Sequence, residues 1–78
     1  MPEYLVTIQF ADGTESKESP VAEPGAIHDE ARAAACREIR VRRSEGRELK
    51  VMGCLIQTKD GKFVSKYERT LGLGVSDE

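Results

Sequence analysis

The chain has 78 residues, of which 38% are hydrophobic and 33% are charged, and its formal net charge is −2. A chain of this length forms one domain with a small core, which excludes a large enclosed active site. The apolar and charged fractions are those of a folded globular protein and exclude a wholly disordered one.

The first strand is predicted at residues 4–10, followed by a hairpin. Apolar side chains occupy every second position: Tyr4, Val6, Ile8 and Phe10. This period is typical of a strand with one face against a core. Asp12-Gly13 predicts a tight type I′ turn, because glycine accepts the positive φ that this turn requires. The returning strand, residues 14–21, is mostly polar and contains Pro20, which suits the edge of a sheet.

One helix is predicted over residues 26–42. Pro24 precedes it, and proline is tolerated in the first turn of a helix. Apolar residues at three- and four-residue intervals form one stripe: Ile27, Ala31, Ala34, Ala35 and Ile39. Acidic residues near the start and arginines near the end complement the helix dipole. Gly46 is predicted to end the helix.

A second hairpin is predicted from residues 49–58 and 62–69, joined by Asp60-Gly61. Gly53, in the middle of the first of these strands, indicates a bulge or a close backbone approach. In the second strand, one face is expected to carry Phe63, Ser65 and Tyr67, and the other Val64 and Lys66. Phe63 and Tyr67 are then either core residues or a platform on which bases stack, and the core is favoured.

The predicted fold class is α+β. The four strands form an antiparallel sheet with one helix packed on one face, a single ββαββ domain over residues 1–69. Residues 70–78 are expected to be a flexible C-terminal tail. No apolar run is long enough to span a membrane and no signal peptide is visible, so a cytoplasmic protein is expected.

No pattern in the chain indicates an enzyme, a cofactor or a metal site. His28 is the only histidine, and it does not converge with Asp29 and Glu30, because consecutive helical residues point about 100° apart. Cys36 and Cys54 lack the spacing of a metal or redox motif and are expected to be free thiols. We therefore expect a surface histidine and a protein without catalytic activity.

Charge is distributed unevenly along the chain. Residues 1–31 hold seven acidic residues and one lysine, whereas residues 32–50 hold seven basic residues and three glutamates. The seven basic residues are the predicted partner-binding residues: Arg32, Arg37, Arg40, Arg42, Arg43, Arg47 and Lys50. Helical spacing places Arg32, Arg40 and Arg43 in one stripe facing solvent. Guanidinium groups there are available to pair with carboxylates or phosphates.

Three interpretations of these charges stay open. The arginines are either a solvated face paired with nearby glutamates and the acidic first third of the chain, or a docking face for a protein, or a face for nucleic acid. The acidic composition favours a protein partner over direct binding of nucleic acid. Acidic residues that imitate phosphates are the alternative surface: Asp12, Glu15, Glu18, Glu23, Asp29 and Glu30.

Three segments of this very short chain, YLVTIQFADGT, DEARAAACREIR and LIQTKDGKFV, together resemble small phage-encoded accessory proteins. That group includes anti-CRISPR inhibitors built as a small sheet with one helix. The resemblance implies that the protein docks on a CRISPR surveillance complex in the host cytoplasm and blocks DNA binding or nuclease recruitment. It contains no motif from which a functional residue can be assigned. The alternative function is a small nucleic-acid-binding or regulatory protein that uses the arginine-rich helix.

A homodimer is also open. Pairing of the edge strand at residues 14–21 would form one, although its charges argue mildly against this. If the helix covers the sheet face with Tyr4, Val6, Ile8 and Phe10, some of the further apolar residues are expected on the opposite face: Leu5, Met52, Cys54, Ile56 and Val64. Such residues favour a partner on that face.

Overall fold

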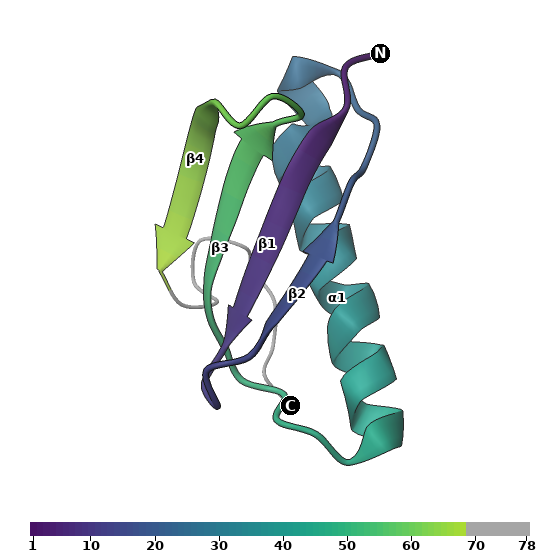
Figure 1. Cartoon of the computed structure of the whole chain (residues 1–78). Helices are drawn as coiled ribbons and strands as arrows, with labels where there is room; N and C mark the ends of the chain where they lie inside the picture. Colours follow the sequence, from purple (N-terminus) through teal and green to yellow (C-terminus); the bar gives the residue numbers. More distant parts are fainter. Residues whose placement is uncertain (69–78) are drawn as a thin grey trace.

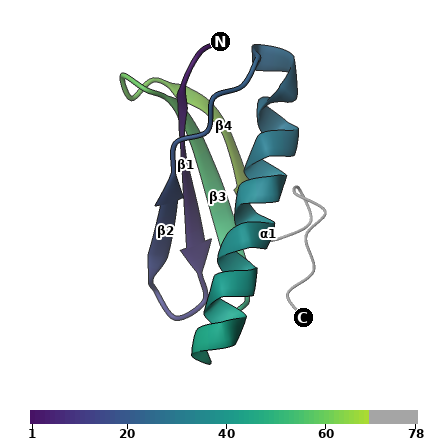
Figure 2. The same ribbon diagram turned by 90° about the vertical axis from the view of Figure 1, so that its right-hand side faces the viewer.

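The protein is a two-layer domain with a sheet on one side and a helix on the other (Figures 1 and 2). A computed structural model describes residues 1–68, so Arg69 and the predicted tail lie outside the described residues. The elements in chain order are β1 (Tyr4–Phe10), β2 (Glu15–Glu18), the 3₁₀ turn η1 (Pro24–Ala26), α1 (Ile27–Glu45), β3 (Val51–Thr58) and β4 (Phe63–Glu68). The sheet has the order β2-β1-β3-β4 with every neighbouring pair antiparallel. The predicted ββαββ fold is confirmed.

The core lies between the sheet and α1. All four alternating residues of β1 are buried there, as predicted: Tyr4, Val6, Ile8 and Phe10. The helix contributes the predicted stripe, Ile27, Ala31, Ala34, Ala35 and Ile39, which is also buried. Because three of these five helical residues are alanines, the helix backbone can lie close to the sheet. Val51, Cys54 and Ile56 are the core residues of β3.

Both hairpin loops have three residues, so the type I′ turn predicted at Asp12-Gly13 is wrong, and Asp60-Gly61 forms only part of the second loop. In the first loop Phe10 N–H donates to the Thr14 carbonyl at 2.9 Å, which encloses residues 11–13. In the second loop Thr58 N–H donates to the Lys62 carbonyl at 2.8 Å. The third loop position has a positive φ in each, 86° at Gly13 and 93° at Gly61. Glycine is therefore required there, but in a longer loop than the Asp-Gly pair alone predicts.

β3 begins at Val51 and β4 at Phe63, one or two residues later than predicted, and β2 and α1 differ more from their predicted bounds. β2 covers residues 15–18 and not 14–21, and beyond it Val21 makes only an isolated bridge to Glu3. Pro20 has no N–H to continue the ladder. The helix runs three residues past Arg42, where Gly46 takes a φ of 69° and its N–H bonds to the Arg43 carbonyl at 3.3 Å. Arg47 N–H bonds to the Arg42 carbonyl at 2.9 Å, completing the Schellman motif.

The alternation predicted for β4 is broken by a register shift. Ile56 pairs with Ser65, but the next residue of β3, Gln57, pairs with Phe63. Phe63 is therefore turned to the face away from the helix and is 67% exposed, so its predicted place beside Tyr67 in the core is wrong. Gly53 has the predicted close approach, because a Cβ there would lie 3.0 Å from Gln9 Oε1 and from the Tyr67 carbonyl oxygen. A register shift in the β1–β3 pairing lies next to it.

Candidate functional site

The seven predicted basic residues do not form one exposed surface. Arg42 is only 1% exposed and belongs to the core, whereas the other six are exposed: Arg32, Arg37, Arg40, Arg43, Arg47 and Lys50. The inclusion of Arg42 in an exposed docking surface is therefore wrong. The physical reason is the helical period, because Arg42 follows Ile39 by three residues and lies on the buried stripe.

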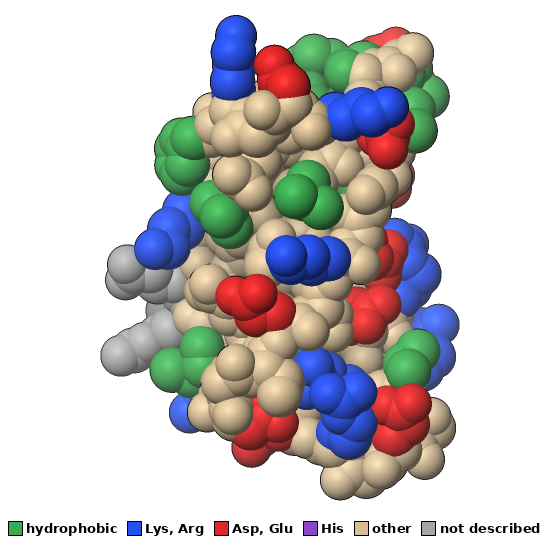
Figure 3. Space-filling model, in the orientation of Figure 1, with side chains coloured by type: hydrophobic (Ala, Val, Ile, Leu, Met, Phe, Trp, Pro, Cys, Tyr) green, Lys and Arg blue, Asp and Glu red, His purple; other side chains and the backbone are tan. Residues whose placement is uncertain are grey.

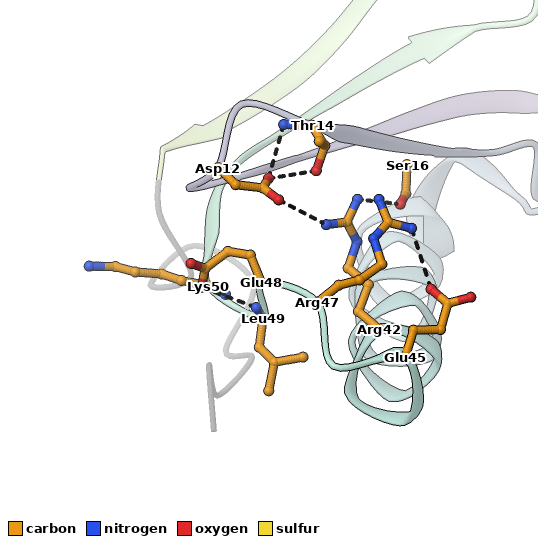
Figure 4. A network of polar contacts seen from close by, with 9 residues as sticks. All are labelled: Asp12, Thr14, Ser16, Arg42, Glu45, Arg47, Glu48, Leu49 and Lys50. Atoms are coloured by element: carbon orange, nitrogen blue, oxygen red, sulfur yellow. Dashed lines mark hydrogen bonds and ion pairs between the residues drawn. The ribbon is translucent and has the colours of Figure 1, made fainter.

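Arg42 closes the core at the C-terminal end of α1. Its Cζ lies 3.6 Å from the centroid of the Phe10 ring, a stacked cation–π contact. Its Nη2 donates to Ser16 Oγ at 3.4 Å, and its Nη1 lies 4.0 Å from Asp12 Oδ2 (Figure 4). Nε and Nη1 are buried and make no hydrogen bond to any residue in the described range. Arg42 is thus a buried arginine that packs in the core and has few polar partners.

Arg37 is held by β2. Its Nη2 and Nε both donate to Glu18 Oε1, at 2.6 and 3.2 Å, and this hydrogen bonding raises the pKa of Arg37. Glu38, the next residue of α1, is partly buried and also lies near Glu18 of β2. Burial and the neighbouring Glu18 carboxylate raise the pKa of Glu38, although Ser16 and Arg42 act in the opposite direction. The junction between β2 and α1 is therefore a compact set of polar groups with little free charge.

Two further arginines have local acidic partners. Arg32 Nη1 lies 3.1 Å from Asp29 Oδ1 within the first turns of α1, and Arg47 Nη1 lies 3.4 Å from Glu45 Oε1 (Figure 4). Lys50 belongs to the segment between α1 and β3, and its side chain points away from Arg42 and Arg47 (Figure 4). The interpretation of the arginines as a solvated face paired with nearby acidic residues thus holds for some of the seven basic residues.

Arg40 and Arg43 differ from these residues. Both are exposed, and neither makes an ion pair or a hydrogen bond through its side chain with any residue between 1 and 67. We call the exposed arginines of α1 the basic face, and its members are Arg32, Arg37, Arg40 and Arg43. Their predicted exposure is confirmed. Within the basic face, Arg40 and Arg43 are the two members without an acidic partner among the described residues.

The six acidic residues of the alternative surface are spread over the molecule. Glu23 precedes η1, and Asp29 and Glu30 lie in the first turn of α1, whereas Asp12 lies in the β1–β2 loop at the other end of the domain (Figure 1). The Asp12 carboxylate accepts hydrogen bonds from Thr14 N–H and Thr14 Oγ1, at 3.0 and 2.6 Å, which lower the pKa of Asp12. Glu18 is paired with Arg37 as described above, and Glu15 accepts a hydrogen bond from Gln9 at 3.4 Å. No single acidic patch gathers these six side chains.

The thiols and the histidine are separate from one another. Both thiols are free, as predicted; Cys36 is exposed, and Cys54 is buried in the core under α1 and does not lie on the opposite face of the sheet. Burial raises the pKa of the Cys54 thiol to about 11. His28 is exposed, as predicted, and its ring meets Tyr67 edge to face with the centroids 5.4 Å apart. No three metal-ligating side chains within residues 1–68 lie close enough to hold a metal ion, and no helix there has the length and apolar character to cross a membrane.

Sequence reasoning missed Arg42 as a core residue, although the signal was present. Its spacing from Ala31, Ala35 and Ile39 fits the apolar stripe, but its charge assigned it to the surface. Comparisons of the chain with protein-family models, curated proteins and solved structures found no match.

Proposed function

We propose that this protein is a non-enzymatic binding module whose basic face docks on a carboxylate-rich surface of a protein partner. The observation that carries the proposal is the pair Arg40 and Arg43. They are exposed cations without a partner among the described residues, on a helix whose other arginines are buried or paired.

The spacing of the two residues suits a carboxylate. Residues three apart on a helix have Cβ atoms about 5–6 Å apart, so two guanidinium groups can approach one anion. Each guanidinium offers a planar fork that pairs with both oxygens of a carboxylate. The helix is packed along the sheet by its alanine stripe, so the two side chains start from a rigid backbone. Less conformational entropy is then lost on binding.

A protein partner is favoured over nucleic acid by the charge around the basic face. Asp29, Glu30 and Glu45 also lie on α1, and the whole chain has a net charge of −2. Phosphates along a duplex would meet these acidic residues as well as the arginines, whereas a protein surface can match both signs. Direct binding of nucleic acid through the same arginines is the second candidate, since phosphate also pairs with guanidinium.

Inhibition of a CRISPR surveillance complex is the most specific form of the proposal. The resemblance of the sequence to small phage-encoded accessory proteins motivates it, and the basic face supplies a surface for docking on an acidic protein region. Its test is whether the protein reduces target-DNA binding by such a complex in proportion to its concentration. If Arg40→Glu/Arg43→Glu no longer reduces target-DNA binding, the inhibition depends on the basic face.

A titration with two polyanions tests the docking proposal. Labelled poly-L-glutamate represents carboxylates and a short DNA duplex represents phosphates, each titrated by fluorescence anisotropy at stepped salt concentrations. The test variant is Arg40→Glu/Arg43→Glu, and the matched control is Lys59→Glu/Lys62→Glu, which changes the net charge equally on the second hairpin. We expect poly-glutamate binding to weaken about tenfold or more in the test variant and little in the control.

If the arginines bind nucleic acid, the DNA duplex and not poly-glutamate is the tighter ligand. Tight binding to the duplex with a steep salt dependence, lost on replacing Arg32, Arg40 and Arg43 by glutamate, would contradict the protein-docking proposal. Equal loss of poly-glutamate binding in both double variants would show that only net charge matters.

A further inference from the structure

The face of the sheet that α1 does not cover has an ordered arrangement of side chains. Successive residues of a strand point to opposite faces, so Thr7 and Gln9 of β1 lie on the face opposite Ile8. Thr7 pairs with Lys17 on one side and with Leu55 on the other, and Leu55 pairs with Lys66. These four residues form one row across all four strands: Lys17, Thr7, Leu55 and Lys66.

A second row lies next to the first, two residues further along β1, or about 6.8 Å away. Gln9 pairs with Glu15 on β2 and with Gly53 on β3. The first row therefore carries exposed lysines, and the second carries the exposed carboxylate of Glu15. Figure 3 shows this face, with a basic and an acidic side chain near its middle and hydrophobic side chains standing singly around them.

We propose that this sheet face packs against the same face of a second copy of the chain. A two-fold axis parallel to the rows and midway between them places each row over the other row of the second copy. Lys17 then faces Glu15 of the other copy, and Glu15 faces its Lys17, which makes two intermolecular ion pairs. Thr7 faces Gln9, and Leu55 faces Gly53. Such a self-complementary patch is what a two-fold interface requires.

The Gln9 side chain shapes the second row. Gly53 has no side chain, and Gln9 Oε1 lies 3.0 Å from where a Gly53 Cβ would be. The Gln9 amide therefore occupies the space beside Gly53, and Leu55 of the other copy would contact this amide. Thr7 is only 6% exposed, so neighbouring side chains cover it on this face.

The area sets the expected strength of the dimer. Four strands about 4.8 Å apart and about six residues long give a face of about 400 Å², or roughly 800 Å² counted over two copies. This is below the size of most stable interfaces, so a dimer that forms at micromolar or higher concentration is expected. Because α1 covers the other face, both basic faces stay exposed. Dimerisation is thus independent of the proposed function, and the dimer would present two copies of the basic face.

Charge exchange between Lys17 and Glu15 tests the proposal. Sedimentation equilibrium of the full chain over a wide concentration range measures the dimer dissociation constant for wild type, Lys17→Glu, Glu15→Lys and the double variant Lys17→Glu/Glu15→Lys. Each single variant turns both ion pairs into repulsions and is expected to weaken dimerisation about tenfold or more. The double variant restores opposite charges in both pairs and is expected to recover the wild-type constant.

Folding is checked by circular dichroism, and Arg40→Glu on the opposite layer serves as the control that leaves dimerisation unchanged. A wild-type chain that stays monomeric at the highest concentration would overturn the proposal. A dimer that neither single variant weakens, or one that the double variant fails to restore, would also overturn it, because the contact would then lie elsewhere.

Discussion

Replacing Arg42 by alanine and by methionine separates the packing of this side chain from its charge. Its side chain is 1% exposed, and its Cζ lies 3.6 Å from the Phe10 ring centroid. Alanine removes the Cγ and Cδ methylenes, worth about 0.8 kcal/mol each when buried, and a cation–π contact worth up to about 2 kcal/mol. Loss of a poorly paired buried charge offsets part of this cost. We expect Arg42→Ala to lower the free energy of unfolding by about 1–3 kcal/mol.

Arg42→Met keeps an unbranched apolar chain over Phe10 and removes the charge. Since Nε and Nη1 have no hydrogen bond among the described residues and the nearest carboxylate oxygen, Asp12 Oδ2, is 4.0 Å away, little polar interaction is lost. The loss of the cation–π contact is offset by the removal of a poorly paired buried charge and by a sulfur–aromatic contact between the methionine and Phe10. We expect the methionine variant to lie within about 1 kcal/mol of wild type.

Urea unfolding followed by circular dichroism measures both variants. A domain of 78 residues has a total stability of about 4–12 kcal/mol, so the alanine variant loses a measurable part of it. Arg40→Ala, at an exposed position of the same helix, is the control and is expected to change stability by less than about 0.5 kcal/mol. If Arg42→Met proves as unstable as Arg42→Ala, the charge and not the packing of Arg42 stabilises the fold, and the reasoning is refuted.

Three further predictions concern the helix end, a partly buried carboxyl and the thiols. Gly46→Ala is expected to lower stability by about 1 kcal/mol, because the residue has a φ of 69°, whereas Gly25→Ala, at an open position without positive φ, changes it little in thermal unfolding. The pKa of Glu38 is raised above its ordinary value of 4.5, so ionisation costs stability as pH rises past that value; Glu38→Gln is expected to melt higher than wild type at neutral pH and equally below pH 4.5. A thiol reagent at pH 8 is expected to modify Cys36 rapidly in the folded protein, and Cys54, with a pKa of about 11, only after unfolding.

The fold was predictable because each element has a clear local pattern. The alternation of β1 and the alanine stripe of α1 each define one buried face, and two Asp-Gly pairs define the hairpins. The register shift that turns Phe63 outward was not predictable, since it depends on how β4 pairs with β3 and leaves no mark in the residues of β4 itself. The loop lengths were missed for a similar reason, because Asp-Gly is compatible with two- and three-residue loops.

The candidate site was predictable only as a set of basic residues. The helical period correctly placed Arg32, Arg40 and Arg43 on the exposed side, but charge was allowed to outweigh the same period for Arg42. Which arginines are paired depends on contacts distant in sequence, such as the one between Arg37 and Glu18 on β2. The register that aligns Lys17 with Thr7 and Leu55 is likewise a property of the folded sheet.

Chemical-shift mapping of the isotope-labelled protein with poly-L-glutamate tests the central claim most directly. The claim predicts that the largest amide shifts fall on residues 37–45 of α1, centred on Arg40 and Arg43, and that they disappear in Arg40→Glu/Arg43→Glu. Shifts centred on the β1–β2 hairpin around Lys17, or shifts on α1 that persist in the double variant, would contradict it.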